Sequence, residues 1–442
     1  TRANVTVQRL VKGIDVFNDS RCYELASYHV GKPNNFVTSV LCYWIGIGQY
    51  LPGRDLVFEL LKTHYFHWVD IFKEFHGLVR VSNYFMNTEI DEETRQKMMY
   101  LNLLVGKEVE EADWKKEIED RTCMDPKPQH LAYDPEISMW TRAQYWRDFQ
   151  GALEDAYLRF GKRKVTDVES FYEFYERRSE WLTKGSTVYN DLPSDMRKYV
   201  VDLVDEVGNV IGQVGGRHNK KSLFEVFDAI SYLETPFELL NVTKMVTKLD
   251  ENGHSRRALF PGGLLHYIIF TYVLMVAEKQ GQVGNVRLNA KPDDDLGYWE
   301  SKLLFSIPRL MFDWTNYNSY HSMDEMALVI QKLGDKVNGP TDYAAFCDVI
   351  AEAMYKMVFQ DPEGGIHYIG RGLYSGWRGT TWINTVLNFI YVRTAEMSFM
   401  RVFDHEPFIY IDGGGDDLDA GMSSAEDGYR MLAVMRKMKF EG

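Results

Sequence analysis

Two adjacent carboxylates follow an apolar run late in the sequence. The run is Pro407 to Ile411, and the carboxylates are Asp416 and Asp417, which come directly after Gly415 in a Gly-rich turn. Neighbouring carboxylates at the end of a buried strand ionise at a high cost in free energy unless a cation compensates them. Ligands that offer only oxygen favour Mg²⁺ or Mn²⁺. The pair therefore indicates a divalent-metal site, although an acidic pair in a Gly-rich turn is also typical of a solvated loop.

A third carboxylate, Asp313, stands in a similar setting. It follows the strand-like run Leu303 to Phe312, and a polar turn comes after it. If both apolar runs form neighbouring strands, Asp313 lies beside Asp416 and Asp417. Three carboxylates in that arrangement can hold two Mg²⁺ ions at the separation that in-line phosphoryl transfer needs. Taken alone, Asp313 is more typical of a helix N-cap or a turn.

A row of polar side chains lies in a segment that otherwise predicts an apolar helix, Thr380 to Arg393. Thr380, Asn384 and Asn388 recur at every fourth position, which places them on one helical face. Amide and hydroxyl groups among Trp, Ile, Val and Leu are costly to bury without partners. A ribose with both hydroxyls is one such partner. A hydrogen-bonded network between helices is the alternative, and it suits Asn388 best.

A turn flanked by cations lies upstream, between Lys244 and Leu259. It carries Lys248, Arg256 and Arg257. Because Arg forms paired hydrogen bonds with phosphate oxygens, this turn suits the triphosphate of an incoming nucleotide. Basic clusters of this kind are usually solvated surface, so both interpretations stay open.

The composition fits a globular protein of two or three packed domains, with 442 residues of which 45% are hydrophobic and 26% charged. The formal net charge of −14 argues against nonspecific coating of nucleic acid over the whole surface, but it allows a local basic channel. Widely spaced cysteines predict reduced thiols in a cytoplasmic compartment and no zinc site. The cysteines are Cys22, Cys42, Cys123 and Cys347.

The elements that must position these residues fall into two regions. Residues 1 to about 235 are predicted to be largely helical, with Glu92 to Arg121 and Val168 to Trp181 as examples. Gly and Pro then become more frequent, and strand-like runs such as Phe408 to Ile411 alternate with helices such as Ser423 to Lys439. This order predicts an α+β fold. The longest apolar stretch, Leu264 to Ala277, is too short to span a bilayer and predicts a buried helix.

In this order, the three motif segments resemble those of viral RNA-dependent RNA polymerases, especially totiviruses and related double-stranded RNA viruses. The resemblance covers roughly residues 244 to 439 and is carried by residues 313–322, 375–388 and 415–417. It implies a right-hand polymerase with fingers and palm, whose thumb is missing from this sequence. The implied domains are residues 1–235, a helical N-terminal region with part of the fingers; 236–300, fingers with the basic NTP-binding motif; and 301–442, a palm with an interleaved fingers segment. The absence of an initiator Met also predicts a fragment or a cleavage product.

The resemblance implies a role for each motif residue. Asp313 and Asp416, assisted by Asp417, would be catalytic and would bind two Mg²⁺ (or Mn²⁺) ions. Substrate binding is implied for residues of the other motifs. They are Asn384, Ser375, Thr380 and Asn318 at the ribose, and Arg257, Arg256 and Lys248 at the triphosphate.

Further positions are implied at the two ends of the motif region. The segment Trp181 to Ser186 resembles the motif through which the template enters, and Lys220 and Lys221 would extend it. At the other end, Lys437 or Lys439 would donate a proton to pyrophosphate. Plain solvated loops are the alternative for the upstream segment.

The implied function is template-directed transfer of NMP from NTP to an RNA 3′-hydroxyl, for viral genome transcription and replication. The implied partners are viral RNA template and product, NTPs and a viral capsid protein, with no membrane, in the virion interior within the host cytoplasm. One alternative is a reverse transcriptase-like polymerase, against which Gly415 and Asn384 argue. Another is a non-catalytic, capsid-associated RNA-packaging protein with a polymerase fold. A protein of that class would have lost the catalytic carboxylates, whereas Asp313, Asp416 and Asp417 are all present in this sequence.

Overall fold

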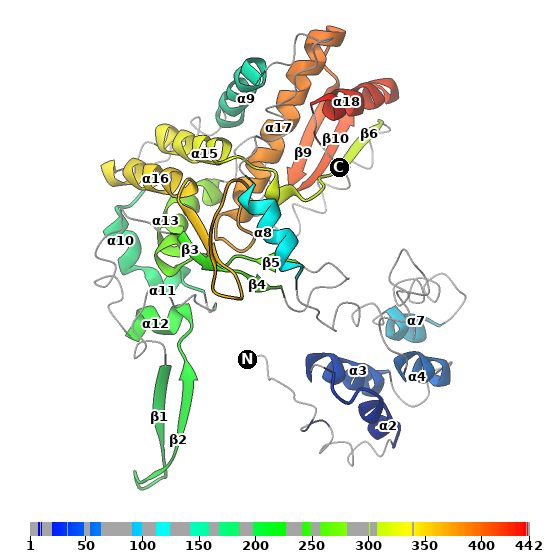
Figure 1. Cartoon of the computed structure of the whole chain (residues 1–442), viewed down its shortest axis with the longest axis vertical. Helices are drawn as coiled ribbons and strands as arrows, with labels where there is room; N and C mark the ends of the chain where they lie inside the picture. Colours follow the sequence, from blue (N-terminus) through cyan, green and yellow to red (C-terminus); the bar gives the residue numbers. More distant parts are fainter. Residues whose placement is uncertain are drawn as a thin grey trace. The chain divides into compact units, whose positions relative to one another are not determined.

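The computed structural model of the chain (Figure 1) divides into two compact units. The first comprises Thr1–Trp114 and Val246–Ala258, and the second comprises Lys115–Met245 and Leu259–Gly442. The domain boundaries predicted near residues 235 and 300 concern functional regions and stay a prediction. The residues that the structure describes are 8, 10, 20–32, 34–47, 54–62, 91–99, 112–123, 142–158, 168–183, 185, 198–226, 241–248, 257–280, 300, 307–337, 340–438 and 440.

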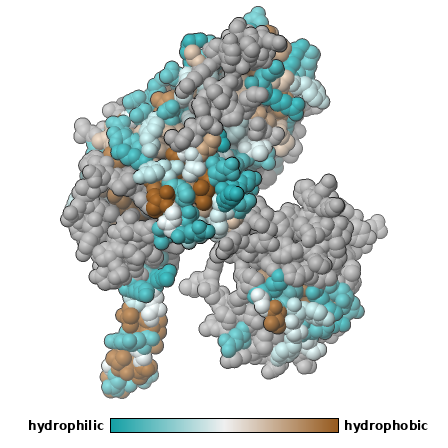
Figure 2. All heavy atoms as spheres, in the orientation of Figure 1, coloured by the Kyte–Doolittle hydropathy of each residue, from teal (hydrophilic) through white to brown (hydrophobic). Residues whose placement is uncertain are grey.

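The N-terminal part of the second unit combines helices with an exposed β-hairpin. The hairpin consists of β1 (Lys198–Val204) and β2 (Val210–Arg217), which pair antiparallel within the region predicted as largely helical. Its β-branched residues favour a strand over a helix. Strand β1 is exposed along its whole length, and Figure 2 shows apolar side chains on this hairpin. The helices of this part are α8 (Trp114–Thr122), α9 (Arg142–Tyr157), α10 (Phe171–Glu176), α11 (Arg178–Trp181) and α12 (Lys220–Val226).

A three-stranded antiparallel sheet carries the acidic segments. Its order is β6 (Arg309–Asp313), β10 (Asp417–Met422) and β9 (Phe408–Gly414), with β10 in the centre. Helices α17 (Thr380–Phe403) and α18 (Ala425–Lys437) pack against the sheet and against each other (Figure 1). Alternation within the strands follows this packing: Leu310, Leu418 and Ala420 are buried, whereas Met311 is 76% exposed.

The remaining elements of the second unit surround this sheet with further helices and a second small sheet. Strand β3 pairs parallel with β7, and β7 pairs antiparallel with β8. Helix α17 is ten residues longer than the predicted Thr380 to Arg393, because its apolar residues continue to be buried up to Phe399. These elements are α13 (Leu264–Gln280), α15 (Met323–Lys336), α16 (Thr341–Met354), β3 (Asn241–Lys244), β7 (Met357–Gln360) and β8 (Ile366–Tyr368).

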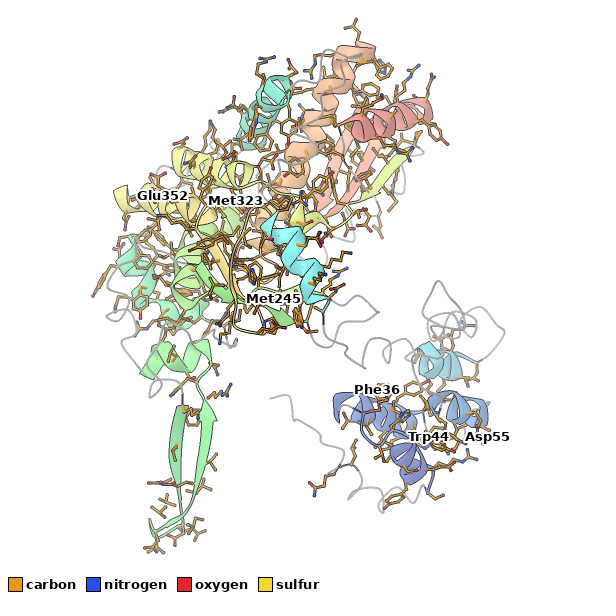
Figure 3. All side chains as sticks on the ribbon, viewed as in Figure 1. Phe36, Trp44, Asp55, Met245, Met323 and Glu352 are labelled. Atoms are coloured by element: carbon orange, nitrogen blue, oxygen red, sulfur yellow. The ribbon has the colours of Figure 1, made fainter. Side chains whose placement is uncertain are left out.

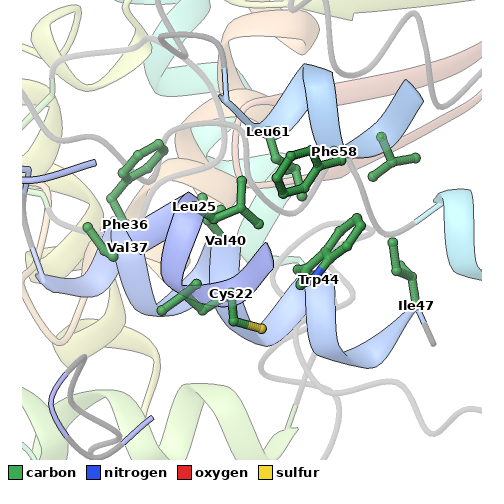
Figure 4. Close-up of a cluster of buried hydrophobic side chains, with 11 residues drawn as sticks. Cys22, Leu25, Phe36, Val37, Val40, Trp44, Ile47, Phe58 and Leu61 are labelled. Carbon is green, nitrogen blue, oxygen red and sulfur yellow. The ribbon is translucent and has the colours of Figure 1, made fainter. Parts of the chain in front are cut away.

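In the first unit, three helices pack around an apolar cluster. They are α2 (Ser20–Tyr28), α3 (Asn34–Gly46) and α4 (Arg54–Lys62). Figure 3 shows Phe36 and Trp44 on α3 and Asp55 on α4. In the cluster (Figure 4), Trp44 is 0% exposed, and the guanidinium carbon of Arg54 lies 3.9 Å from the centroid of its ring. The unit also contains α7 (Glu92–Met99), β4 (Val246–Thr247) and Ala258 of β5 (Ala258–Leu259).

The predicted α+β class is confirmed by this mixture of helices and strands. The buried helix predicted at Leu264 to Ala277 is α13, and the helix predicted at Ser423 to Lys439 is α18. The prediction of one helix from Glu92 to Arg121 is wrong, since residues 112–113 are not helical. All four cysteines are free thiols. Within the described part of the chain, no helix is both long and apolar enough to cross a bilayer.

Candidate active site

The hairpin between β9 and β10 presents the acidic pair. Its two-residue turn is Gly415–Asp416, and Gly414 pairs with Asp417 on either side of it. Gly415 has φ +66°, whereas Asp416 has no positive φ. A two-residue turn with a positive φ at its first position only is of type II′, which takes Gly there because a Cβ would be strained. The Gly before the acidic pair therefore has a local structural reason.

The structure brings all three predicted carboxylates to one end of the sheet. Asp313 is the last residue of β6, and Asp417 is the first residue of β10. These two residues lie directly opposite each other in the antiparallel register. Opposite residues of such a pair have Cβ atoms roughly 5 Å apart. Asp416 precedes Asp417 in the turn, and all three side chains are exposed.

The charges of this group oppose one another. Although Asp417 is largely exposed, its pKa is raised, first by the partial loss of hydration and then by the charges of Asp416 and Asp313. Since like charges that face each other across a sheet are destabilising, a divalent cation is the species that would relieve the repulsion.

The donor set fits Mg²⁺ or Mn²⁺, because every candidate ligand is a carboxylate oxygen. Among the described residues, no group of three or more His, Cys, Asp or Glu side chains is arranged as a metal-binding cluster. Mg²⁺ usually takes one or two carboxylates and completes its shell with water and substrate phosphate.

Helix α17 fixes the acidic turn through Asn388, which is 1% exposed. Its Nδ2 donates to the carbonyl of Asp417 at 2.9 Å and to that of Gly415 at 3.3 Å. Its Oδ1 accepts a hydrogen bond from Nε1 of Trp314 at 3.0 Å. Because Trp314 directly follows Asp313, one amide joins the two segments that carry the carboxylates. Asn388 thus belongs to an internal hydrogen-bond network. The sequence left a network between helices open as the alternative for this residue, whereas its partners here are Trp314 and the acidic turn.

Thr385 gives the turn a second attachment to α17. Its hydroxyl accepts a hydrogen bond from the backbone N–H of Gly415 at 2.9 Å and donates to the carbonyl of Thr381 at 2.6 Å. No role was predicted for Thr385, since a buried Thr in a helix usually only bonds to its own preceding turn.

The predicted ribose residues Asn384 and Asn318 are in direct contact. Nδ2 of Asn384 donates to Oδ1 of Asn318 at 2.8 Å, and Asn384 is 8% exposed. Asn318 lies in a 3₁₀ turn (Tyr317–Ser319) shortly after Asp313. Thr380 donates instead to the carbonyl of Tyr374 at 2.7 Å, which holds the loop before α17. Ser375 is part of that loop.

The loop before α17 is bonded to the turn that carries Asn318. Leu373 N–H donates to the carbonyl of Asn318 at 2.6 Å, and Gly372 N–H donates to that of His321 at 2.8 Å. Gly372 has φ +94°, and a Cβ there would lie 3.0 Å from the Asn318 carbonyl oxygen. Only Gly therefore allows this close approach.

Arg121 on α8 supports the same loop from a region that carries no motif. It is 5% exposed, donates from Nη1 to the carbonyl of Leu373 at 3.0 Å, and stacks 4.2 Å from the ring centroid of Phe260. A single Arg in a polar helix gives no signal of such a role in the sequence.

The predicted triphosphate residues lie in the first unit. Lys248 N–H donates to the carbonyl of Arg257 at 2.9 Å, so the two residues are backbone neighbours beside the paired strands β4 and β5. The side chain of Arg257 is exposed. Arg256 lies outside the described residues.

The predicted template segments come together in the second unit. Lys220 N–H donates to the carbonyl of Gly185 at 3.0 Å, and Nζ of Lys220 lies 3.6 Å from the ring centroid of Tyr267. Burial, followed by the charge of Arg378, lowers the pKa of Lys220. Among the described residues, no carboxylate pairs with Lys220, whereas Arg378 forms a two-fold ion pair with Glu278 at 2.6 and 2.5 Å.

Two further predicted positions lie within the described residues. Lys221 donates to the carbonyl of Ser179 at 3.0 Å, and Lys437 ends α18. Lys439, Lys184 and Ser186 lie outside the described residues.

Comparison with known proteins gives a consistent result. The family model described as "Viral RNA-directed RNA-polymerase" matches residues 11–442. The chain is 43% identical to the "RNA-directed RNA polymerase" of Penicillium chrysogenum virus (isolate Caston/2003) over 443 aligned positions, which cover 100% of this chain and 40% of that protein. It is 32% identical, over 32% of this chain and 17% of the relative, to the "Probable RNA-directed RNA polymerase" of Helminthosporium victoriae virus-190S.

A similar protein of Saccharomyces cerevisiae virus L-A is 30% identical over 29% of this chain and 8% of its own length. The chain thus spans less than half the length of these relatives. The resemblance that the motifs indicated is confirmed, and the match extends well beyond them into the N-terminal region. The chain belongs to the family of viral RNA-directed RNA polymerases.

Proposed function

We propose that this chain contains the fingers and palm of an RNA-directed RNA polymerase that transfers NMP from NTP to an RNA 3′-hydroxyl on a template. The observation that carries the proposal is the direct opposition of Asp313 and Asp417 at the end of one sheet, with Asp416 in the adjoining turn. Membership of the family supports the reaction class. Viral genome transcription and replication would be the purpose.

The carboxylates would bind the metal ions of the reaction. Asp313 and Asp416, assisted by Asp417, would hold two Mg²⁺ or Mn²⁺ ions. When bound, such ions lower the pKa of the attacking hydroxyl and neutralise charge on the pyrophosphate leaving group. The contribution of the chain is to hold the carboxylates rigidly, which it does through the backbone of the turn and the amide of Asn388.

The substrate would be held by the polar residues around α17 and by the basic residues of the upstream turn. Asn384 and Asn318, with Ser375 and Thr380 in support, would contact the ribose. Each amide can both donate to and accept from a hydroxyl. The triphosphate would be bound by the three cations that the sequence motif supplies. They are Lys248, Arg256 and Arg257.

The RNA template would approach Lys220, whose ammonium lies over the ring of Tyr267. A phosphodiester is the anion that would pair with it there. We also propose that the enzyme works with a capsid protein inside the virion, in the host cytoplasm. That last placement rests on the resemblance to totivirus polymerases.

The test is NTP incorporation on an RNA template by the complete viral protein, with Asp416→Asn and Asp419→Asn compared. Asp419 lies two residues after Asp417 in β10, and its carboxylate accepts a hydrogen bond from the Tyr410 hydroxyl. We expect Asp416→Asn to reduce incorporation on the order of 10²-fold or more, as loss of transition-state charge stabilisation does. Asp419→Asn should retain activity within about twofold.

Three outcomes would overturn the proposal. Preferential incorporation of dNTPs would favour a reverse transcriptase-like enzyme. Full NTP incorporation by Asp416→Asn would show that the acidic pair is not the catalytic centre. RNA binding by the wild type without any NTP incorporation would favour a packaging protein.

A further inference from the structure

A buried chain of hydrogen bonds leads away from Asn384 on the side opposite to Asn318. Nε2 of His321 lies 3.0 Å from Oδ1 of Asn384, and Nδ1 of His321 lies 3.0 Å from the hydroxyl of Tyr391. The Tyr391 hydroxyl donates to Oε2 of Glu325 at 2.8 Å. His321, Tyr391 and Glu325 are all 0% exposed. In such a dry environment each hydrogen bond has a large effect on its neighbours.

Three elements meet at this chain and hold it in place. Asn384 and Tyr391 are seven residues apart on α17, which places them on one face two turns apart. Glu325 lies in the first turn of α15, where its Oε2 also accepts from the N–H of Ser322 at 2.9 Å. Tyr145 of α9 donates to the other oxygen, Oε1, at 2.6 Å.

The number of available protons decides the direction of each bond. Burial, followed by the charge of Glu325, raises the pKa of Tyr391 well above its usual value, so the hydroxyl keeps its proton. That single proton is directed at Glu325, and the Tyr391 oxygen therefore accepts from Nδ1–H of His321. Because Nδ2 of Asn384 donates to Asn318, the oxygen Oδ1 faces Nε2, which must donate as well.

Both ring nitrogens of His321 thus donate, which is the pattern of an imidazolium. A buried cation needs a compensating anion, and the Glu325 carboxylate lies one hydroxyl away. A ring without a proton on Nε2 would accept there instead. The Asn384 amide would then have to turn over, so that Nδ2 faced His321 and Oδ1 faced Asn318.

We infer that His321, held by Tyr391 and Glu325, is a positioning residue that fixes the orientation of the Asn384 amide and thereby sets the preference for NTP over dNTP. The inference rests on the proposed function, since Asn384 must contact the ribose for its orientation to matter. Turning the amide over exchanges a donor for an acceptor at the 2′-hydroxyl. Binding of a substrate without that hydroxyl does not depend on which way the amide is turned.

The test compares two substitutions that each remove one buried hydroxyl from Glu325. Tyr391→Phe also removes the partner of His321, whereas Tyr145→Phe leaves His321 untouched. We expect Tyr391→Phe to lower the ratio of kcat/KM for NTP over dNTP by about tenfold, the effect of one buried hydrogen bond. The loss should come through kcat/KM for NTP, with that for dNTP within about twofold. Tyr145→Phe should keep the wild-type ratio, although both variants lose thermal stability.

A second pair of variants tests His321 itself. His321→Gln keeps a polar group near Asn384 and should retain more of the NTP preference than His321→Leu does. A purely structural role would lower kcat/KM for both substrates together and leave the ratio unchanged in every variant. That result, or equal ratios for Tyr391→Phe and Tyr145→Phe, would overturn the inference while NTP incorporation by the wild type still supports the proposed function. Absence of NTP incorporation by the wild type would instead overturn the proposed function.

Discussion

Asp313 and Asp417 face each other across two antiparallel strands, β6 and β10, although 104 positions separate them in the sequence (417 minus 313). The pairing is unfavourable for the charges alone, since like charges opposite each other in a sheet repel. Apolar residues further along the same strands are buried against helices and hold the register in place. The fold therefore holds these carboxylates close together although their charges repel one another.

Substitution of Asp417 should separate stability from activity. In the absence of divalent metal, Asp417→Asn removes a repulsion and should stabilise the fold by about 0.5 kcal/mol, the scale of one cross-strand pair. With Mg²⁺ present, wild-type Tm should rise and the variant's Tm should rise less, because metal that binds only the folded state stabilises it. Thermal melts with EDTA and with Mg²⁺ measure both effects. A variant that is less stable than wild type in EDTA would contradict the repulsion.

Loss of Asn388 should disturb the site without touching a carboxylate. Asn388→Leu would leave the Trp314 N–H and the Asp417 carbonyl without their buried partner, at a cost of about 1–3 kcal/mol per unsatisfied group. Because the acidic turn then loses its attachment to α17, we expect kcat to fall on the order of 10²-fold. Thr394→Val, which removes a buried hydroxyl bond on the same helix, is the matched control and should keep kcat. Equal kcat values for the two variants would show that the Asn388 amide does not position the carboxylates.

The parts of the site that could be predicted from the sequence are those with local signals. Asp416 and Asp417 follow a strand and a Gly-rich turn, and Asn384 and Asn388 lie on one face of a helix, so spacing alone indicated their placement. The placement of Asn384 and Asn318 in one site was implied only by resemblance to a family. Helix α17 extended beyond its predicted end, because burial on all sides removes the periodic pattern that marks where a helix stops.

Other parts of the site depend on contacts that no local pattern encodes. Arg121 reaches Leu373 from a helix 252 positions away, and Tyr145 reaches Glu325 across 180 positions. The β1–β2 hairpin was missed because a run of helices around it suggested more helix. Its many β-branched residues were the available signal.

Lys220 should contribute to RNA binding through charge alone. Lys220→Met keeps most of the aliphatic length against Tyr267 and removes the cation. We expect the affinity of the complete protein for single-stranded template RNA to fall, and the slope of log K against log salt to become shallower by about 0.7, the value for one phosphate contact. Lys221→Met is the control, since Lys221 already bonds to the carbonyl of Ser179. Titrations at several salt concentrations measure the slope, and an unchanged slope for Lys220→Met would exclude a phosphate contact.

The His405–Asp427 pair should make stability depend on pH in a defined window. Nε2 of His405 lies 3.0 Å from Oδ1 of Asp427, at the start of α18. The Phe403 carbonyl and then Asp427 raise the pKa of His405 above 6.5, whereas Ser424 and then His405 lower the pKa of Asp427 below 3.8. Because the pKa of His405 is raised on folding, its contribution to stability is fully present below the pKa of the unfolded state. That contribution is lost as pH rises through the pKa of the folded state. A lowered Asp pKa contributes stability above the unfolded value that is lost as pH falls through the folded value.

The pair is therefore fully stabilising between about pH 4 and 6.5, the unfolded pKa values of the two groups. We expect the Tm of the wild type to fall as pH rises from 6 to 8. The Tm of His405→Gln should fall less over the same range, because Gln does not titrate. The effect is small, since His405 is largely exposed to solvent. Comparison of the two Tm profiles isolates it, because every other titrating group is common to both proteins. Parallel profiles would show that the pair does not contribute to the pH dependence of folding.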